Sequence, residues 1–289
     1  MIRHFLKRAD QVIAVSHATA EEAIARGLEA AKTRVIANGI AASAVCHAKA
    51  SERDRHALEQ AVGRPLMGKK ILLTVGRLVQ RKGVRHCVEN ILPHVFARRG
   101  DVVYLVVGEG KHRSEIEAAI ARAGYQDSVF LLGRVSDELL GAVMRLAHVF
   151  VMPNVQVPGD MEGFGIAAIE ASLAGLPVVA SGIEGIRDAV VEGCNGFLIT
   201  PQQPKAFAEK ILTLLENEAE RARFGNAGRQ FTLEKFNWRH IAGEYLEAFE
   251  QLCAGKCKRS VSSISNVVSK KAGKLSTITP ASGLNKLRQ

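Results

Sequence analysis

The stretch KILLTVGRLVQRKG, residues 70–83, decides the fold of this chain. Its first six residues are mostly apolar, which predicts a central strand of a parallel sheet that is covered on both faces. Gly76 follows at once and permits a tight turn into a basic loop. Ligands of open α/β sheets lie beyond the carboxyl ends of the strands, so this loop is a candidate binding segment.

Similar short apolar runs recur on both sides of this stretch and alternate with segments of helical period. Residues 84–96 place apolar side chains at helical spacing over three turns, and Ser136 before two acidic residues predicts the start of another helix. This alternation predicts an α/β fold with a Rossmann-like parallel sheet and helices on both faces. The predicted strands are 11–15, 34–37, 70–75, 102–107, 128–132, 148–152, 177–180 and 196–199.

The chain of 289 residues is long enough for one large or two small domains. Its first forty residues hold one strand–helix–strand unit, which is too small to bury both faces of a sheet. The predicted segments are 1–48 as this small unit, 49–69 as a polar linker and lead-in, 70–200 as the Rossmann-like domain, 201–253 as C-terminal helices, and 254–289 as a basic, Ser-rich tail that we expect to be disordered.

The formal net charge of +10 is concentrated in that tail, which has eight basic residues and no acidic one, so the rest carries about +2. The tail is a solvated extension or a contact for anionic lipid at about 1 kcal/mol per basic residue. A nucleic-acid partner would rest on the tail alone and is not expected. No apolar run reaches membrane-spanning length and no signal peptide is evident, so we expect a cytoplasmic protein, either free or peripheral at the inner face of the membrane.

The segment 161–170 is the second candidate binding segment. Its two glycines open an apolar helix, whose free N–H groups form an anion site at the strand ends. Glu170 lies inside this apolar run, where a carboxylate needs partners, and the two hydroxyls of a ribose would supply two donors. A structural glutamate bonded to a backbone amide is the alternative.

Two further turns, 107–110 and 132–136, are predicted on the same edge of the sheet. Gly108 and Gly110 lack the third glycine of a dinucleotide fingerprint, so that reading is weak. Arg134 and Val135 hold a base by stacking and backbone hydrogen bonds, or merely cap a helix. The five scattered cysteines fit reduced thiols, and His17, His94 and His148 are interpreted as surface or structural residues.

Taken together, these residues resemble the C-terminal domain of retaining glycosyltransferases of family 4, which have the GT-B fold of two facing Rossmann-like domains. The resemblance runs from about residue 10 to residue 252. It is carried by Gly76-Arg77-Leu78 with Lys82-Gly83, Val107-Gly108-Glu109-Gly110, Pro153-Asn154, Glu162-Gly163-Phe164-Gly165 with Glu170, Ala174-Gly175-Leu176-Pro177 and Asn195-Gly196-Phe197-Leu198.

The resemblance implies transfer of a sugar from a nucleotide-diphosphate sugar, with retention, to an acceptor that it does not identify. Arg77 and Lys82 would hold the diphosphate in place of a metal ion, and no cofactor is expected. Glu170 would bind the ribose. Glu162, the candidate catalytic residue, would contact the donor sugar and either take part in the chemistry or position the sugar, of which positioning is favoured. The amides of Phe164, Gly165 and Ile166 would contact sugar and phosphate, with Arg134 and Val135 near the base.

The chain departs from the family pattern at two places. Residues 184–188, EGIRD, stand where the family carries Gly-Gly-x-Pro-Glu. The upstream domain is reduced to about forty residues, without the usual acceptor pocket or catalytic histidine. We therefore expect either a transferase that is completed by a partner chain or a longer form, or a non-catalytic nucleotide-sugar-binding module or inactive truncated remnant.

Overall fold

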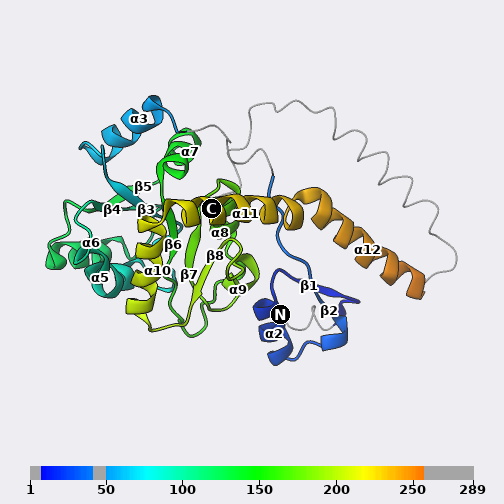
Figure 1. The fold of residues 1–289 in the computed structure, drawn as a ribbon. Helices are drawn as coiled ribbons and strands as arrows, with labels where there is room; N and C mark the ends of the chain where they lie inside the picture. The colour runs from blue at the N-terminus through cyan, green and yellow to red at the C-terminus, as the bar shows by residue number, and fades with distance from the viewer. Residues whose placement is uncertain (1–7, 42–49, 257–289) are drawn as a thin grey trace. The chain divides into compact units, whose positions relative to one another are not determined.

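A computed structural model describes residues 8–41 and 50–256, with side chains to residue 254. It contains a six-stranded, all-parallel sheet in the order β5-β4-β3-β6-β7-β8 (Figure 1). The strands are β3 (Lys70–Val75), β4 (Val102–Val107), β5 (Val129–Gly133), β6 (Val149–Met152), β7 (Val178–Ser181) and β8 (Gly196–Ile199). The predicted α/β fold is confirmed, and each of these strands ends within one residue of its predicted bounds.

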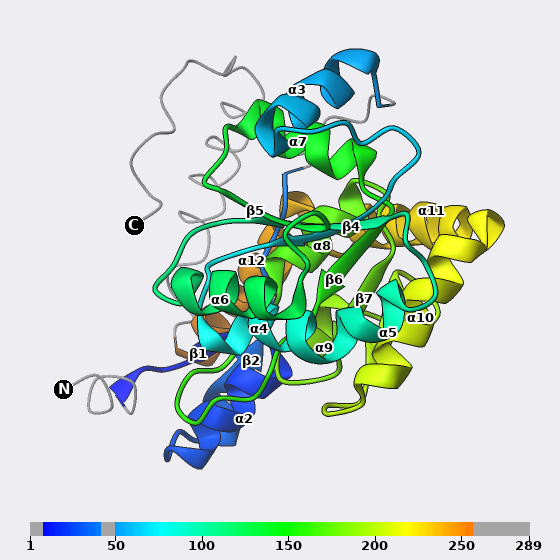
Figure 2. The ribbon, with the colours of Figure 1, turned by 90° about the vertical axis from the view of Figure 1, so that its left-hand side faces the viewer.

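Alternate strand residues face two separate apolar layers, because successive side chains of a strand point to opposite faces of the sheet. Leu72 and Tyr104 join one buried cluster, and Leu73 and Leu105 join the other. Helices cover both faces, as Figure 2 shows. The first layer packs under α4 (Val84–His86), α5 (Leu92–Phe96), α6 (Arg113–Ala123) and α10 (Pro204–Glu216), and the second under α3 (Glu52–Val62), α7 (Asp137–Leu146), α8 (Ile166–Leu173) and α9 (Ile186–Ala189).

The predicted helix over 84–96 forms, but with a π-helical turn at Cys87–Ile91 between α4 and α5. The N–H of Leu92 donates to the carbonyl of Cys87, five residues back. Pro93 has no N–H to continue the regular ladder, so the wider turn precedes it. The apolar spacing predicted the helix, and the proline explains its irregular middle.

The interpretation of 49–69 as a linker missed α3. Ser51 and Asp54 cap this helix reciprocally, and Leu58 is 1% exposed in the second apolar layer. Asp54 also receives two hydrogen bonds from Arg145 of α7, at 2.5 and 3.1 Å. The Arg145 guanidinium holds the pKa of the Asp54 carboxyl well below its usual range. One buried leucine in a charged segment is too sparse a pattern to mark a core helix.

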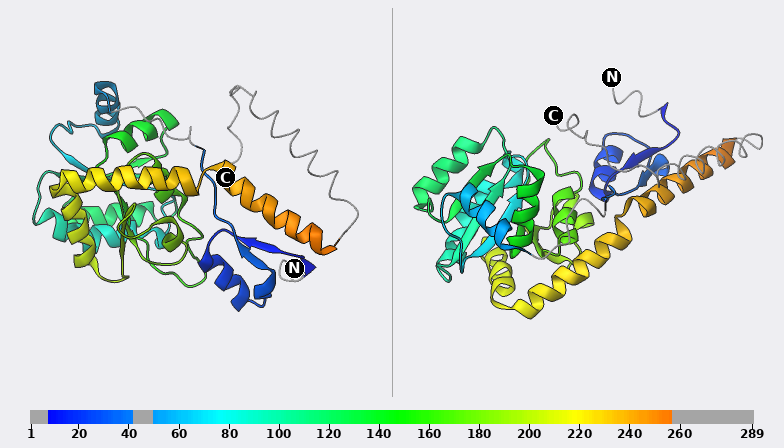
Figure 3. Two further views of the ribbon diagram at one scale, coloured as in Figure 1. Left: turned by 45° about the vertical axis from the view of Figure 1, so that its right-hand side comes forward. Right: turned by 90° about the horizontal axis from the view of Figure 1, so that it is seen from above.

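The N-terminal residues form the predicted strand–helix–strand unit, drawn in blue in Figure 3. Its elements are β1 (Val12–Ala14), α2 (His17–Ala25) and β2 (Thr33–Val35), with β1 and β2 parallel. Ser16 caps α2 and accepts the N–H of Thr19. The structure thus confirms the helix of the predicted strand–helix–strand unit.

Three helices follow the sheet, as predicted: α10, α11 (Glu218–Lys235) and α12 (Trp238–Lys256). The N–H of Ile40 donates to the carbonyl of Phe236, and a Cβ on Gly39 would lie 2.6 Å from the ring of Trp238. Beyond residue 256 the basic tail lies outside the described residues, and its order and lipid contact stay predictions. No helix in the described part of the chain is long and apolar enough to cross a membrane.

Candidate functional site

The candidate site lies where the strand order reverses, between β3 and β6. Open α/β sheets bind ligands in the crevice at this switch point. Here the loops that follow the two strands touch: the N–H of Val155 donates to the carbonyl of Arg81, at 2.9 Å. A Cβ on Gly83 would lie only 1.8 Å from the carbonyl oxygen of Pro153, so glycine is required for this approach.

The same edge continues across β4 and β5. The N–H of Gly76 donates to Val107 and the N–H of Gly108 to Gly133, at 2.9 and 2.8 Å. These bonds align the turns after three neighbouring strands, as the sequence predicted. Arg77 and Arg134 project from this edge and are exposed.

The centre of the site is an ion pair between two predicted residues, Lys82 and Glu162. The Lys82 Nζ lies 2.6 Å from Glu162 Oε2, and the two side chains are 12% and 10% exposed. The aliphatic part of Lys82 passes over Gly76, where a Cβ would lie 3.3 Å from Cε. An amine and a carboxylate from loops that are 80 residues apart therefore meet at the switch point.

Two further residues of this cluster were missed from the sequence, Arg81 and Asn154. The Asn154 amide donates to Glu162 Oε2 at 3.1 Å. The buried Arg81 guanidinium lies 3.7 Å from Glu162 and 3.5 Å from Asp160. Its position beside Lys82 in a basic loop is visible in the sequence, but only the fold shows that the side chain is buried.

Glu184, in the segment that departs from the family pattern, also joins the cluster. Its carboxylate accepts the backbone N–H of Glu162. Its φ of +48° is in the left-handed region that favours glycine. Burial raises the pKa of its carboxyl, and the charge of Glu162 acts in the same direction. This strained residue fixes the start of the 162–165 loop.

The predicted glycine-led helix is α8. Gly165, at φ +90°, precedes it without a side-chain cap, and Ile166 is 47% exposed. The ring of Phe164 is buried and packs edge-on against Phe236, with 5.6 Å between centroids. That side chain is structural, so only backbone groups remain for a ligand there. Glu170 is half-buried in α8 and Val135 is half-buried after β5.

The histidines behave as the sequence indicated. His148 Nδ1 accepts the N–H of Ile71 at 3.2 Å, and burial lowers its pKa to about 4. His17 is exposed and bonds Asp188 through Nδ1 at 2.6 Å. His94 lies in α5.

A cavity of about 470 Å³ borders the cluster on the side of α2. Asp160, Glu184 and Arg187 line it from the main domain, and Glu21 and Arg26 line it from α2. The structure therefore joins Lys82 to Glu162 and places Arg77, Arg134 and the start of α8 beyond the same strand ends. Contact of all of them with one ligand remains a prediction.

Comparison with known proteins identifies the family of this site. Residues 58–231 match the family described as glycosyl transferases group 1, and residues 1–43 match glycosyltransferase family 4. A 2-deoxystreptamine glucosyltransferase of Streptomyces kanamyceticus is 33% identical over 71% of this chain and 51% of its own length. A phosphatidyl-myo-inositol mannosyltransferase of Mycobacterium leprae is 32% identical over 71% of this chain and 52% of its own. The chain thus spans about half the length of these relatives.

Solved structures agree with the sequence matches. HepE of Anabaena, in complex with UDP and glucose, superposes with a TM-score of 0.73 at 26% identity, over 86% of this chain and 65% of HepE. Sucrose-phosphate synthase of Thermosynechococcus elongatus gives 0.72 at 28% identity, over 88% and 61%. The matched fold is the GT-B type that the resemblance implied. Because the family model covers more than half of its residues, this chain belongs to the group 1 glycosyl transferases.

Proposed function

We propose that this chain binds a nucleotide-diphosphate sugar and serves in a retaining, metal-independent transfer of the sugar to an acceptor. The observation that carries the proposal is the Lys82–Glu162 pair, which stands at the switch point with a basic loop on one side and a glycine-led helix on the other. The complex of HepE with UDP and glucose supports a donor of this class.

In this proposal the Lys82 ammonium leaves Glu162 and pairs with the diphosphate when the donor binds. Arg77 adds a second cation, and both stabilise the negative charge that develops on the departing diphosphate, where a metal ion acts in other transferases. The freed Glu162 carboxylate, still bonded to Asn154, accepts a hydroxyl of the donor sugar. Glu162 therefore positions the sugar.

The other predicted residues complete the donor site. Uncapped N–H groups from 164 to 166 face the phosphate or the sugar, since helix N-termini favour anions. Glu170 accepts the ribose hydroxyls, and Arg134 with Val135 flanks the base. We propose that the acceptor side is completed by a partner chain or by a longer form of the protein.

Calorimetry with UDP, GDP and their sugars tests donor binding. We expect at least one to bind, and Lys82→Ala or Glu170→Ala to weaken it at least tenfold, because each removes a charged partner of the ligand. Lys235→Ala, an exposed lysine at the end of α11, is the matched control and should bind normally. Absence of binding by every nucleotide would overturn the proposal.

Donor hydrolysis separates the transferase from the alternative, a non-catalytic nucleotide-sugar-binding module. Slow release of free sugar from the donor, abolished by Glu162→Ala, supports the transferase. Tight donor binding with no release and no transfer to any added glycan or cyclitol supports the binding module instead.

A further inference from the structure

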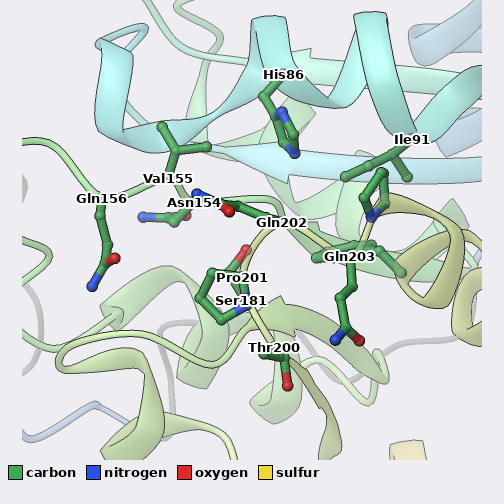
Figure 4. A pocket seen from close by; sticks show the side chains of 12 residues that line it. His86, Ile91, Asn154, Val155, Gln156, Ser181, Thr200, Pro201, Gln202 and Gln203 are labelled. Carbon is green, nitrogen blue, oxygen red and sulfur yellow. The ribbon is translucent and has the colours of Figure 1, made fainter.

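A cavity of about 250 Å³ lies beyond the carboxyl ends of β6, β7 and β8 (Figure 4). Asn154 contributes to it from the loop after β6, Ser181 from the end of β7 and Thr200 from the end of β8. His86 of α4 and Phe207 of α10 also line it. None of the predicted donor-binding residues lines this cavity.

The polar side chains that line the cavity are uncharged. Among the described residues that line the cavity, none is Asp, Glu, Lys or Arg. Polar atoms come instead from amides and hydroxyls, which donate and accept hydrogen bonds without charge. They belong to Asn154, Gln156, Ser181, Thr200, Gln202 and Gln203. Such a lining neither neutralises an anion nor attracts a cation.

Several of these groups are accessible to a ligand. Ser181, at the end of β7, is 6% exposed and lines the cavity. Gln203 precedes α10 without capping it and is exposed, so its amide is available to a ligand. The exposed amides of Gln156, Gln202 and Gln203 bond water in the free protein and can exchange it for the hydroxyls of a ligand.

His86 supplies a defined donor. Its Nδ1 lies 3.1 Å from the Asn90 amide nitrogen, which can only donate. The proton of the neutral ring is therefore on Nε2. Burial lowers the pKa of His86, so the neutral form is favoured further. Figure 4 shows the ring reaching from α4 toward the cavity.

We propose that this cavity is a second carbohydrate site, which binds one neutral sugar or cyclitol ring separately from the nucleotide donor. Amides and hydroxyls match the ring hydroxyls, which both donate and accept, while Ile91, Pro201 and Phe207 offer apolar surface to the C–H face. The volume is just below that of pockets for drug-sized ligands, about 300 Å³ and above, and suits a single ring. Asn154, which also holds Glu162, connects the two sites.

Ligand-observed NMR on the full chain tests this site with glucose, mannose and myo-inositol. At least one should bind saturably, and glucuronate should bind at least tenfold more weakly because nothing in the cavity compensates its charge. Ser181→Ala with Gln203→Ala should weaken the neutral sugar about tenfold through two lost hydrogen bonds. Gln60→Ala on α3 is the control and should bind like the original chain.

Calorimetry with UDP and GDP on the same double variant separates the two sites, since its nucleotide affinity should be unchanged. Absence of saturable binding by all three neutral rings overturns the second site, as does glucuronate binding as tightly as glucose. Equal sugar affinity in the double variant and in Gln60→Ala overturns it too. Failure of the donor proposal would appear only in the nucleotide titration.

Discussion

Some charged side chains at the switch point are buried away from water. Arg81 is buried between Glu162 and Asp160, and its Nε makes no hydrogen bond with a described residue. Removing one partner of a buried pair leaves the opposite charge uncompensated. The stability of this loop therefore depends on a cation that nothing in the sequence distinguishes from its exposed neighbour Arg77.

Arg81→Met should accordingly lower the free energy of unfolding by about 3 kcal/mol, the usual cost of breaking a buried pair. Arg77→Met removes the same charge from an exposed position in the same loop and should change stability by less than about 0.5 kcal/mol. Urea unfolding followed by circular dichroism measures both. An equal loss of unfolding free energy in the two variants would contradict the burial of Arg81.

His148 makes stability depend on pH. Its pKa is about 4 in the folded chain against a usual value of 6.5, so the unfolded chain binds the additional proton between these values. The contribution of neutral His148 to the free energy of unfolding is therefore fully present above pH 6.5. It falls by up to about 3 kcal/mol as the pH decreases to 4. His86, whose pKa is also lowered, contributes in the same direction.

His148→Asn should keep the acceptor for the Ile71 N–H through its Oδ1 and remove the titration. Unfolding free energies measured from pH 7 to pH 4 should therefore fall less steeply in the variant than in the original chain. If the unfolding free energies of the two chains fell equally with pH, the His148 imidazole would not be shielded from protonation in the folded chain.

At the scale of elements, glycines at the loop junction decide how closely the loops approach. Gly83 and Gly63 share a left-handed backbone, at φ +66° and +77°, but only Gly83 meets another backbone. A Cβ at Gly83 would overlap Pro153, whereas nothing lies within 4 Å of one at Gly63. Substitutions at Gly63 and Gly83 therefore separate the free-energy cost of a left-handed backbone from the cost of steric overlap with Pro153.

Gly63→Ala should cost about 1 kcal/mol, the left-handed penalty alone. Gly83→Ala should cost several kcal/mol more and weaken nucleotide binding, because the loop that carries Lys82 has to move away from Pro153. Denaturant unfolding and calorimetry measure the two effects. Similar stability and similar nucleotide affinity in both variants would argue against this junction.

For the whole molecule, the basic segment 254–289 is predicted to give a charge-dependent attraction to anionic lipid. A chain that ends at residue 253 should lose most of its co-sedimentation with phosphatidylserine vesicles at low salt. Neutral phosphatidylcholine vesicles provide the control and should retain neither form. Nucleotide binding should be the same in both chains, and unchanged retention on the anionic vesicles would exclude the tail as a lipid contact.

The sequence alone determined the sheet and the chemical character of its edge. Continuous apolar runs such as 70–75 leave few alternatives to a buried parallel strand, and glycine and cations directly after them mark the ligand-binding side. The helix over 84–96 followed from apolar spacing, and the helix after Ser136 from its capping residue. These features are local, and local patterns are what a sequence displays directly.

Only the tertiary structure decided which charges are buried and which surfaces are hollow. Arg81 and Asn154 entered the site because loops distant in the sequence meet at the switch point. The helix α3 depends on a single buried leucine and on a distant arginine, and the cavity of Ser181 and Gln203 exists only where three strand ends meet. Burial is a property of segments brought together by packing, so periodicity within one segment does not reveal it.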